Sequence, residues 1–375
     1  MRRNLYGGQA MSSEANNRGA FLIQEHYCRQ MDAPIYADIC AALARGLTRE
    51  SRTGVRVLDW PGEPTRDALP LRLMGGLHAL VLAGADDELA AIFREQVRGE
   101  ALEAALLRVL ARHDETLLPW LDGPPQTNEP GRSGALIVGL IEVARRFGPR
   151  IEVLEIGSSA GLNLLIDRYR FDLGGAMLGP ADSPVTIAPE WRGATPDVPP
   201  LEIVSTRGCD VAPMDAADPA VEARLSAYVW AEKPERLTRL KRAIGMVRAR
   251  PVRLEKADAA DWIEARLAEP QVEGVTRVLM HSVVWQYLPD ATANRIRAVM
   301  RAAGARATPE RPLAWVAMEP DRARAEQLVS VACWPGDGTR DVLATAHAHA
   351  AWVKPGPREV EGGRIALPNA AKVEL

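Results

Sequence analysis

The residues best suited to chemistry lie in one short run, where an apolar segment (151–156) leads into Gly-Ser-Ser-Ala-Gly at 157–161. A turn rich in glycine lets a ligand approach the backbone closely, because glycine has no Cβ to obstruct it. We expect an amphipathic helix after the turn, and the free N–H groups of its first turn would face the same ligand. Glu155 precedes the turn, where its carboxylate can accept a hydrogen bond from a ligand amine or hydroxyl. The run therefore predicts a ligand-binding turn between a strand and a helix.

The same turn fits G-x-S-x-G, the nucleophile elbow of α/β-hydrolases, with Ser159 as the nucleophile between Gly157 and Gly161. A base would have to follow along the chain, and the candidates are His281, His347 and His349. That elbow comes after several strands of its sheet, whereas the region before residue 151 has a helical pattern. No HGGG-type oxyanion segment occurs either. A serine hydrolase is one alternative interpretation, and a glycine turn that binds nothing is another.

His281 lies in a second apolar run, 278–284, which an aromatic segment (285–287) follows. The unperturbed pKa of histidine, about 6.5, suits a general base near neutral pH, so His281 is the candidate catalytic residue. The alternative is that its ring packs against a ligand or the end of a sheet. His347 and His349 would put two imidazoles on one face of a strand. Because no third ligand stands at a useful spacing, no metal site is predicted.

To lie close together, these residues must stand at the ends of neighbouring strands. The chain after residue 132 has a pattern that predicts such strands. Short apolar runs alternate with helical periodicity over residues 133–318. This alternation predicts an α/β fold, with a Rossmann-like, mostly parallel sheet and helices on both faces. The expected strands are 151–156, 201–205, 252–255, 278–284 and 313–318. The expected helices are 133–147, 220–247, 259–267 and 291–303.

The first third of the chain has a different pattern. Roughly the first 18 residues are polar and aperiodic, and residues 21–112 show helical periodicity. Residues 1–125 are therefore predicted to form an N-terminal all-α cap region, in which only Val55–Leu58 resembles a strand. A loop rich in Pro and Gly (119–131) marks the boundary, so residues 126–375 form the second domain. We expect the cap region to close over the substrate of that domain.

Two further segments depart from the simple alternation. Residues 169–192 interrupt it and predict a β-hairpin insertion, with Gly174 and Gly175 as turn residues. Residues 342–353 near the end of the chain predict antiparallel edge strands.

In this context the run around Glu155 resembles the first motif of the class I S-adenosylmethionine-dependent methyltransferases, E/D-x-G-x-G-x-G. Glu155, Gly157 and Gly161 match that motif, and Ser159 replaces its middle glycine. The resemblance implies that these residues, with Asn163, hold S-adenosylmethionine at the end of the first strand. The chain as a whole looks like an uncharacterised bacterial protein family.

Three later segments are similar to the later motifs of the same superfamily. The resemblance implies that Asp210 closes the second strand and binds the ribose hydroxyls; the alternative is an ordinary turn residue. It implies that Asp258 accepts from the adenine amino group while the N–H of Ala259 contacts the ring; the alternative for Asp258 is a helix N-cap. Residues 278–290 resemble the fourth strand and its loop.

The resemblance also assigns roles at the reacting end of the cofactor. It implies that His281 lies beside the methyl group and that Arg132 binds the carboxylate of the amino-acid part, a pairing that suits a guanidinium. The alternative for Arg132 is a polar loop. The implied function is methyl transfer from S-adenosylmethionine to a small molecule. A non-catalytic nucleotide- or cofactor-binding protein is a further alternative, and the G-x-G-x-x-G spacing of NAD-dependent enzymes is missing.

Composition narrows the classes of partner. The 46 Lys and Arg residues against 49 Asp and Glu give a net charge of −3, which predicts no standing attraction to nucleic acid or an anionic membrane. The 4 cysteines form no C-x-x-C pair and are expected to be reduced thiols. No apolar signal segment follows Arg2 and Arg3, and no membrane span is evident. These features predict a cytoplasmic protein that acts on a small molecule, and they leave its oligomeric state open.

Overall fold

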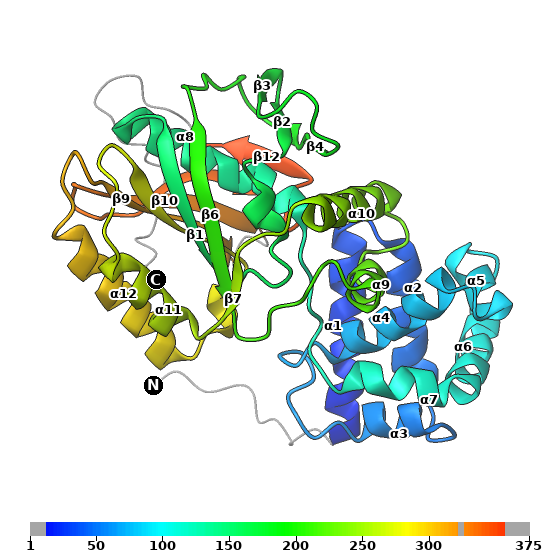
Figure 1. Ribbon diagram of the computed structural model, residues 1–375. Coiled ribbons are helices and arrows are strands. Elements are labelled where there is room, and N and C mark those ends of the chain that lie inside the picture. Colours follow the sequence, from blue (N-terminus) through cyan, green and yellow to red (C-terminus); the bar gives the residue numbers. More distant parts are fainter. Residues whose placement is uncertain (1–12, 322–325, 357–375) are drawn as a thin grey trace, which may run out of the picture. The chain divides into compact units, whose positions relative to one another are not determined.

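In a computed structural model that describes residues 13–321 and 326–356, the chain divides into two compact units (Figure 1). The first unit comprises Met1–Thr127 together with Glu222–Leu237, and the second comprises Asn128–Val221 together with Thr238–Leu375. The segment 222–237 thus belongs to the first unit, although the sequence places it beyond the boundary loop.

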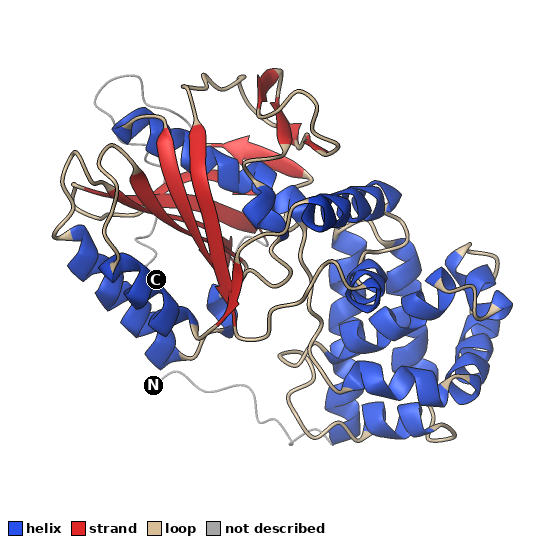
Figure 2. Ribbon diagram, in the orientation of Figure 1, coloured by secondary structure: helices blue, strands red, loops and turns tan. Residues whose placement is uncertain are grey.

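The first unit is helical throughout its described residues (Figure 2). Its apolar core includes the fully buried Tyr36, which stacks on Trp230 with ring centroids 5.5 Å apart. His78 and Glu232 join the two parts of the unit, because His78 Nδ1 hydrogen-bonds to the carbonyl oxygen of Ala227 and Glu232 accepts from the N–H of Ile35. Its helices are α1 (Ser13–Gln30), α2 (Pro34–Gly46), α3 (Arg52–Leu58), α4 (Leu69–Leu82), α5 (Asp87–Phe93), α6 (Glu100–Arg112), α7 (Asp114–Leu117) and the 3₁₀ turn η1 (Leu118–Leu121).

Two predictions about this region are wrong. Val55–Leu58 is the end of α3 rather than a strand, because Ser51 caps the helix by accepting from the N–H of Gly54. The expected single helix over 220–247 is two helices, α9 (Pro219–Ala227) and α10 (Pro234–Ala249). Pro234 starts the second, since proline is tolerated in the first turn of a helix but not in its interior.

The second unit is built on a nine-stranded sheet in the order β5-β12-β11-β10-β9-β8-β1-β6-β7 (Figure 1). The run from β9 to β7 is parallel, which agrees with the α/β fold expected from the alternating pattern. The strands β9 to β12 form an antiparallel meander, which confirms antiparallel strands in the segment 342–353. They are not edge strands as expected, because β12 pairs with the two-residue strand β5, which forms the edge of the sheet. The strands are β1 (Arg150–Ile156), β5 (Glu190–Trp191), β6 (Glu202–Asp210), β7 (Leu254–Lys256), β8 (Thr276–Ser282), β9 (Leu313–Asp321), β10 (Glu326–Trp334), β11 (Asp341–Ala346) and β12 (Trp352–Pro355).

Helices cover both faces of the sheet (Figure 2). One face carries α8 (Ser133–Phe147), and the other carries α11 (Ala259–Ala268) and α12 (Asp290–Gly304). Side chains alternate along each strand, so Leu154 and Ile156 of β1 pack in the α11–α12 core while Glu155 points to the α8 face.

Gly139 sets how closely α8 approaches the sheet, because a Cβ at this position would overlap the methyl groups of Val316 on β9. Gly245 in α10 serves as the control, because a Cβ added to it would meet no atom within 4 Å. Gly245→Ala should stabilise the chain by up to about 1 kcal/mol through helix propensity. Gly139→Ala should instead lower the free energy of unfolding by about 1–3 kcal/mol, since the helix must shift away from β9. Urea unfolding measures both, and a stabilised Gly139→Ala variant would contradict the close packing.

The interruption after β1 contains the expected hairpin and lacks the expected helix. Strands β2 (Arg170–Leu173) and β3 (Ala176–Leu178) pair across the Gly174–Gly175 turn, and β4 (Thr186–Ile187) joins β2. Between the glycine turn and β2, the structure has only the 3₁₀ turn η3 (Leu162–Leu165), so the amphipathic helix predicted there is wrong.

Candidate functional site

The glycine turn lies where the strand order of the sheet reverses. From β1 the chain moves to β6 and β7 on one side, and it then crosses to β8 and β9 on the other. In open parallel sheets, ligands bind outside the carboxyl ends of the strands at such a reversal. The turn at 157–161 follows the carboxyl end of β1 directly, so it occupies that position.

The backbone of the turn requires its glycines. Gly157 and Gly161 have φ of +67° and +73°, and Ser159 between them has φ of +57°. A Cβ on Gly157 would overlap Val284, and a Cβ on Gly161 would lie 2.7 Å from the side chain of Val252. The positive φ values explain the glycines, and they leave Ser159 in a backbone conformation that costs a non-glycine residue roughly 1 kcal/mol or more.

The N–H groups of this turn are largely used within the protein. The donors are Ser158, Ser159, Gly161 and Leu162. Ser159 N donates to Asp210 Oδ2 at 2.9 Å, and Leu162 N donates to Asn128 Oδ1 at 2.7 Å. The N–H groups of Ser159, Gly161 and Leu162 are therefore not available to a ligand, although free N–H groups were expected after the turn. Instead, a carboxylate at the end of β6 holds the turn.

Glu155 is buried beneath the turn. Its side chain is 1% exposed, and Oε2 has no hydrogen-bond partner. The pKa of Glu155 is raised to about 7: burial is the main cause and the charge of Asp210 adds to it, while hydrogen bonds from Ser158 and Asn163 and the charge of Arg132 oppose the shift. Near neutral pH this carboxyl is therefore poised between its two protonation states.

Asn163 and Arg132 lie on the α8 side of the sheet, near Glu155. Asn163 Oδ1 accepts from the hydroxyl of Ser133 at 2.9 Å, and its side chain bonds to Glu155. Arg132, in the 3₁₀ turn η2 (Pro130–Arg132), donates from Nε to the carbonyl oxygen of Ala348 at 3.1 Å. The structure thus brings three of the sequence-predicted residues together: Glu155, Asn163 and Arg132.

Asp210 closes β6 and Asp258 follows β7, as expected, and both accept hydrogen bonds from backbone N–H groups. Besides Ser159, Asp210 accepts from the N–H of Ala212 at 2.9 Å through Oδ1. Asp258 is exposed and caps α11, accepting from the N–H of Ala260 and of Asp261 at 2.8 and 3.1 Å. The N-cap alternative for Asp258 is thus what the geometry shows. A role in binding adenine, for Asp258 or for the buried Ala259, stays a prediction.

His281 is fully buried at the carboxyl end of β8, on the α11–α12 face rather than on the face of Glu155. Its Nδ1 lies 2.7 Å from Glu319 Oε1, and its ring stacks on Trp285 with centroids 5.3 Å apart. A carboxylate oxygen only accepts, so Nδ1 carries the hydrogen, and in the neutral ring Nε2 keeps a lone pair. Nε2 has no hydrogen-bond partner.

Glu319 near the end of β9 was missed by the sequence analysis. Its Oε1 also accepts from the N–H of Val284 at 3.0 Å and of Trp285 at 3.3 Å, and so it organises the segment after β8. Val283 in that segment has φ of +53°, which is rare for a β-branched residue and marks a strained, specified backbone. The sequence signal that could have identified Glu319 is its position directly after the apolar run 313–318.

The hydrolase alternative requires a base beside Ser159. Ser159 Oγ is buried and has no hydrogen-bond partner, and His281 is bonded to Glu319 instead. The described residues therefore contain no Ser159–histidine hydrogen bond, and this geometry does not favour an elbow nucleophile.

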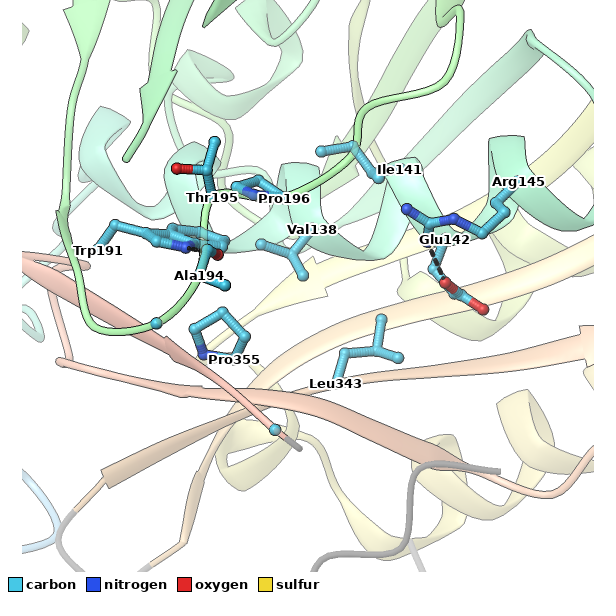
Figure 3. A pocket seen from close by; sticks show the side chains of 12 residues that line it. Val138, Ile141, Glu142, Arg145, Trp191, Ala194, Thr195, Pro196, Leu343 and Pro355 are labelled. Carbon is cyan, nitrogen blue, oxygen red and sulfur yellow. Dashed lines mark hydrogen bonds and ion pairs between the residues drawn. The ribbon is translucent and has the colours of Figure 1, made fainter. Parts of the chain in front are cut away.

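A cavity of about 510 Å³ is lined by none of these residues. Figure 3 shows the side chains that line it. The cavity is bounded by the outer side of α8, by Trp191 and the segment after it, and by Leu343 and Pro355 of the meander. Its polar groups are paired internally: Glu142 with Arg145, and Trp191 Nε1 with the carbonyl oxygen of Ala194. The cavity offers apolar surface without an unpaired group that would select a ligand.

Over the described ranges 13–321 and 326–356, no group of three or more His, Cys, Asp or Glu side chains is placed to hold a metal ion. His347 and His349 lie side by side in the turn between β11 and β12, with ring centroids 5.4 Å apart. No helix in these ranges is both long enough and apolar enough to cross a membrane.

Comparison with known proteins places the chain in a family. No curated protein and no solved structure gives a significant match. One family model matches residues 18–354, which includes nearly all of both units. The chain therefore belongs to the family described as "uncharacterized protein conserved in bacteria" (DUF2332).

Proposed function

We propose that the second unit binds S-adenosylmethionine at the glycine turn and transfers its methyl group to a small molecule. The observation that carries the proposal is the position of this turn, at the reversal of the strand order and tied to Asp210 at the end of the neighbouring strand. Both features are expected of a site for an adenosine-containing cofactor on a parallel sheet.

The hydrogen bonds of the turn favour a ligand without phosphate groups. A glycine turn that binds a dinucleotide points free N–H groups at the pyrophosphate. Here the N–H groups of Ser159 and Leu162 already donate hydrogen bonds to the side chains of Asp210 and Asn128. A nucleotide-binding protein, the non-catalytic alternative, would need those donors for its ligand. S-adenosylmethionine has no phosphate, so the internal pairing is compatible with it.

The buried charges suit the amino-acid part of this cofactor. Glu155 has an unpaired Oε2 that can accept from an ammonium group, and Arg132 can bind a carboxylate. Asp210 keeps lone pairs for ribose hydroxyls beside its two backbone bonds. When bound, the cofactor supplies a methyl group on a sulfonium centre, and the protein supplies position and exclusion of water.

His281 and Glu319 provide a candidate general base. Glu319 fixes the tautomer with hydrogen on Nδ1, so Nε2 is the atom that can take a proton. We propose that Nε2 receives the proton which the acceptor molecule loses as its nucleophilic atom is methylated. His281 stays the candidate catalytic residue on this reasoning.

Isothermal titration calorimetry tests the proposal. S-adenosylmethionine and S-adenosylhomocysteine should both bind with micromolar affinity, and NADH should not. Asp210→Asn should weaken both by about tenfold or more, because the turn loses one charge-assisted bond and the ribose loses its acceptor. Asp215→Asn is the matched control, since Asp215 is exposed and its side chain accepts from the N–H of Ala217.

Three results would count against the proposal. Absence of binding by the folded wild-type chain would remove the cofactor. Equal affinities in the Asp210→Asn and Asp215→Asn variants would move the site away from the glycine turn. Labelling of Ser159 by a fluorophosphonate, without cofactor binding, would indicate a serine hydrolase instead.

A further inference from the structure

A second group of polar atoms lies buried and unpaired on the α12 face of the sheet. These atoms are His281 Nε2, Trp315 Nε1, Glu319 Oε2, Arg297 Nε and Arg340 Nη2. His281 and Trp315 are 0% and 4% exposed, so water reaches neither ring freely. Most buried polar groups in folded proteins are paired, so the five unpaired atoms on these side chains are available to bind a ligand.

Aromatic contacts connect the residues into one cluster. The ring of Trp315 lies 6.0 Å from His281 and 5.4 Å from Trp285, measured between centroids. The guanidinium of Arg340 lies 5.3 Å from the centre of Trp315, and that of Arg297 lies 5.1 Å from the centre of Trp285. We call these residues, with Glu319, the arginine–tryptophan cluster.

The unpaired atoms divide into donors and acceptors. Trp315 Nε1, Arg297 Nε and Arg340 Nη2 can only donate. In the neutral ring His281 Nε2 can only accept, as can the ionised Glu319 Oε2. Arg340 Nη1 is already bonded to the hydroxyl of Ser330 at 2.8 Å, which leaves Nη2 for a ligand.

The charge of the cluster favours an anion. It holds two guanidinium groups against one carboxylate, and Glu319 is already engaged through Oε1 by His281 and two backbone N–H groups. The pKa of Arg340 is lowered to about 10, chiefly by burial; the charge of Glu319 opposes this shift, and the charge of Arg297 adds to it. An anion beside Arg340 would favour the charged form of its guanidinium, as the charge of Glu319 already does in part.

We propose that the arginine–tryptophan cluster binds the carboxylate of a small hydroxy- or amino-acid-like molecule. The three donors match the lone pairs of one carboxylate, and His281 Nε2 and Glu319 Oε2 face the ligand's hydroxyl or amine. Together with the proposed function, on which this step rests, the inference names the methyl acceptor as a carboxylate-bearing small molecule that presents its nucleophile to His281.

Calorimetry without S-adenosylmethionine tests binding directly. The probes are acetate, glycolate and benzoate, each compared with its neutral amide, and inorganic phosphate. We expect at least one carboxylate to bind at least tenfold more tightly than its amide and than phosphate. Arg340→Gln and Arg297→Gln should each reduce that preference at least tenfold. Arg295→Gln is the matched control on the helix that carries Arg297, because Arg295 is exposed and pairs with Asp261 and Glu264.

The inference fails if no carboxylate is preferred over its amide or over phosphate. It also fails if the preference survives in both cluster variants, once urea unfolding shows that these are folded. Asp210→Asn separates the two proposals, since it should weaken S-adenosylmethionine binding and leave carboxylate binding unchanged. Carboxylate binding without any cofactor binding would retain this site and remove the methyltransferase.

Discussion

Replacing Glu319 with leucine should lower the free energy of unfolding by about 3–5 kcal/mol, the largest effect that we expect from one substitution. One oxygen, Oε1, accepts from His281 Nδ1 and from the N–H groups of Val284 and Trp285. Leucine leaves all three donors without an acceptor, and each unsatisfied buried donor costs about 1–3 kcal/mol. The segment after β8 can relax in part, so the total stays below the sum.

Glu319→Gln removes the negative charge and keeps a hydrogen-bond acceptor, so it separates the effects of the two. Glutamine keeps a carbonyl oxygen that can accept the same three bonds, so its loss should be about 1–2 kcal/mol. Glu310→Leu is the control for a surface change from glutamate to leucine, since Glu310 is exposed and should shift stability by less than about 0.5 kcal/mol. Urea unfolding at one pH measures all three variants. If leucine at 319 proves no worse than glutamine, the three hydrogen bonds do not hold this segment.

Glu155 should make the stability of the chain fall as pH rises from about 4.5 to about 7. Its pKa in the folded chain is about 7 against an ordinary value of 4.5. Between these values the unfolded chain has released the proton while the folded chain still holds it, so raising the pH favours unfolding. The difference in pKa corresponds to roughly 3 kcal/mol, which is fully present below pH 4.5 and lost above pH 7.

Comparison with Glu155→Gln isolates this effect. The glutamine variant keeps the shape of the protonated carboxyl and has no proton to lose, so wild type should lose roughly 3 kcal/mol relative to it over that range. The charged neighbours Asp210 and Arg132 are present in both proteins. Urea unfolding at pH 4.5, 6, 7 and 8 measures the difference, with Glu310→Gln as an exposed control. A difference that does not change with pH would mean that Glu155 ionises normally in the folded chain.

Several features of the site follow from local sequence alone. The apolar runs around Val153 and Leu279 form the strands β1 and β8, because short apolar segments that alternate with helices are buried on both faces of a parallel sheet. The glycine turn follows β1 as expected, since Gly157 and Gly161 adopt the positive φ that glycine tolerates best. Asp210 closes β6, five residues beyond the predicted end of that strand at 205.

Other predictions failed because contacts between distant residues overrode local preference. The pattern of 220–247 favours one helix, but Trp230 stacks on Tyr36 and Pro234 begins a new helix. After the glycine turn, Leu162 N bonds to Asn128, 34 residues earlier in the chain, and only a 3₁₀ turn forms. Neither partner could be identified from the spacing of apolar residues.

The sequence by itself thus determined the α/β class, the strand that leads to the glycine turn, and the acidic residues at the ends of β6 and β7. Only the tertiary structure decided the partners of the candidate catalytic groups. Glu319 is 38 residues from His281. Arg340, which lies in the connection between β10 and β11, contacts the ring of Trp315 on β9. Hydrophobic periodicity records which side of an element is buried, whereas hydrogen bonds between side chains depend on the register of neighbouring strands, which the packing of the whole sheet sets.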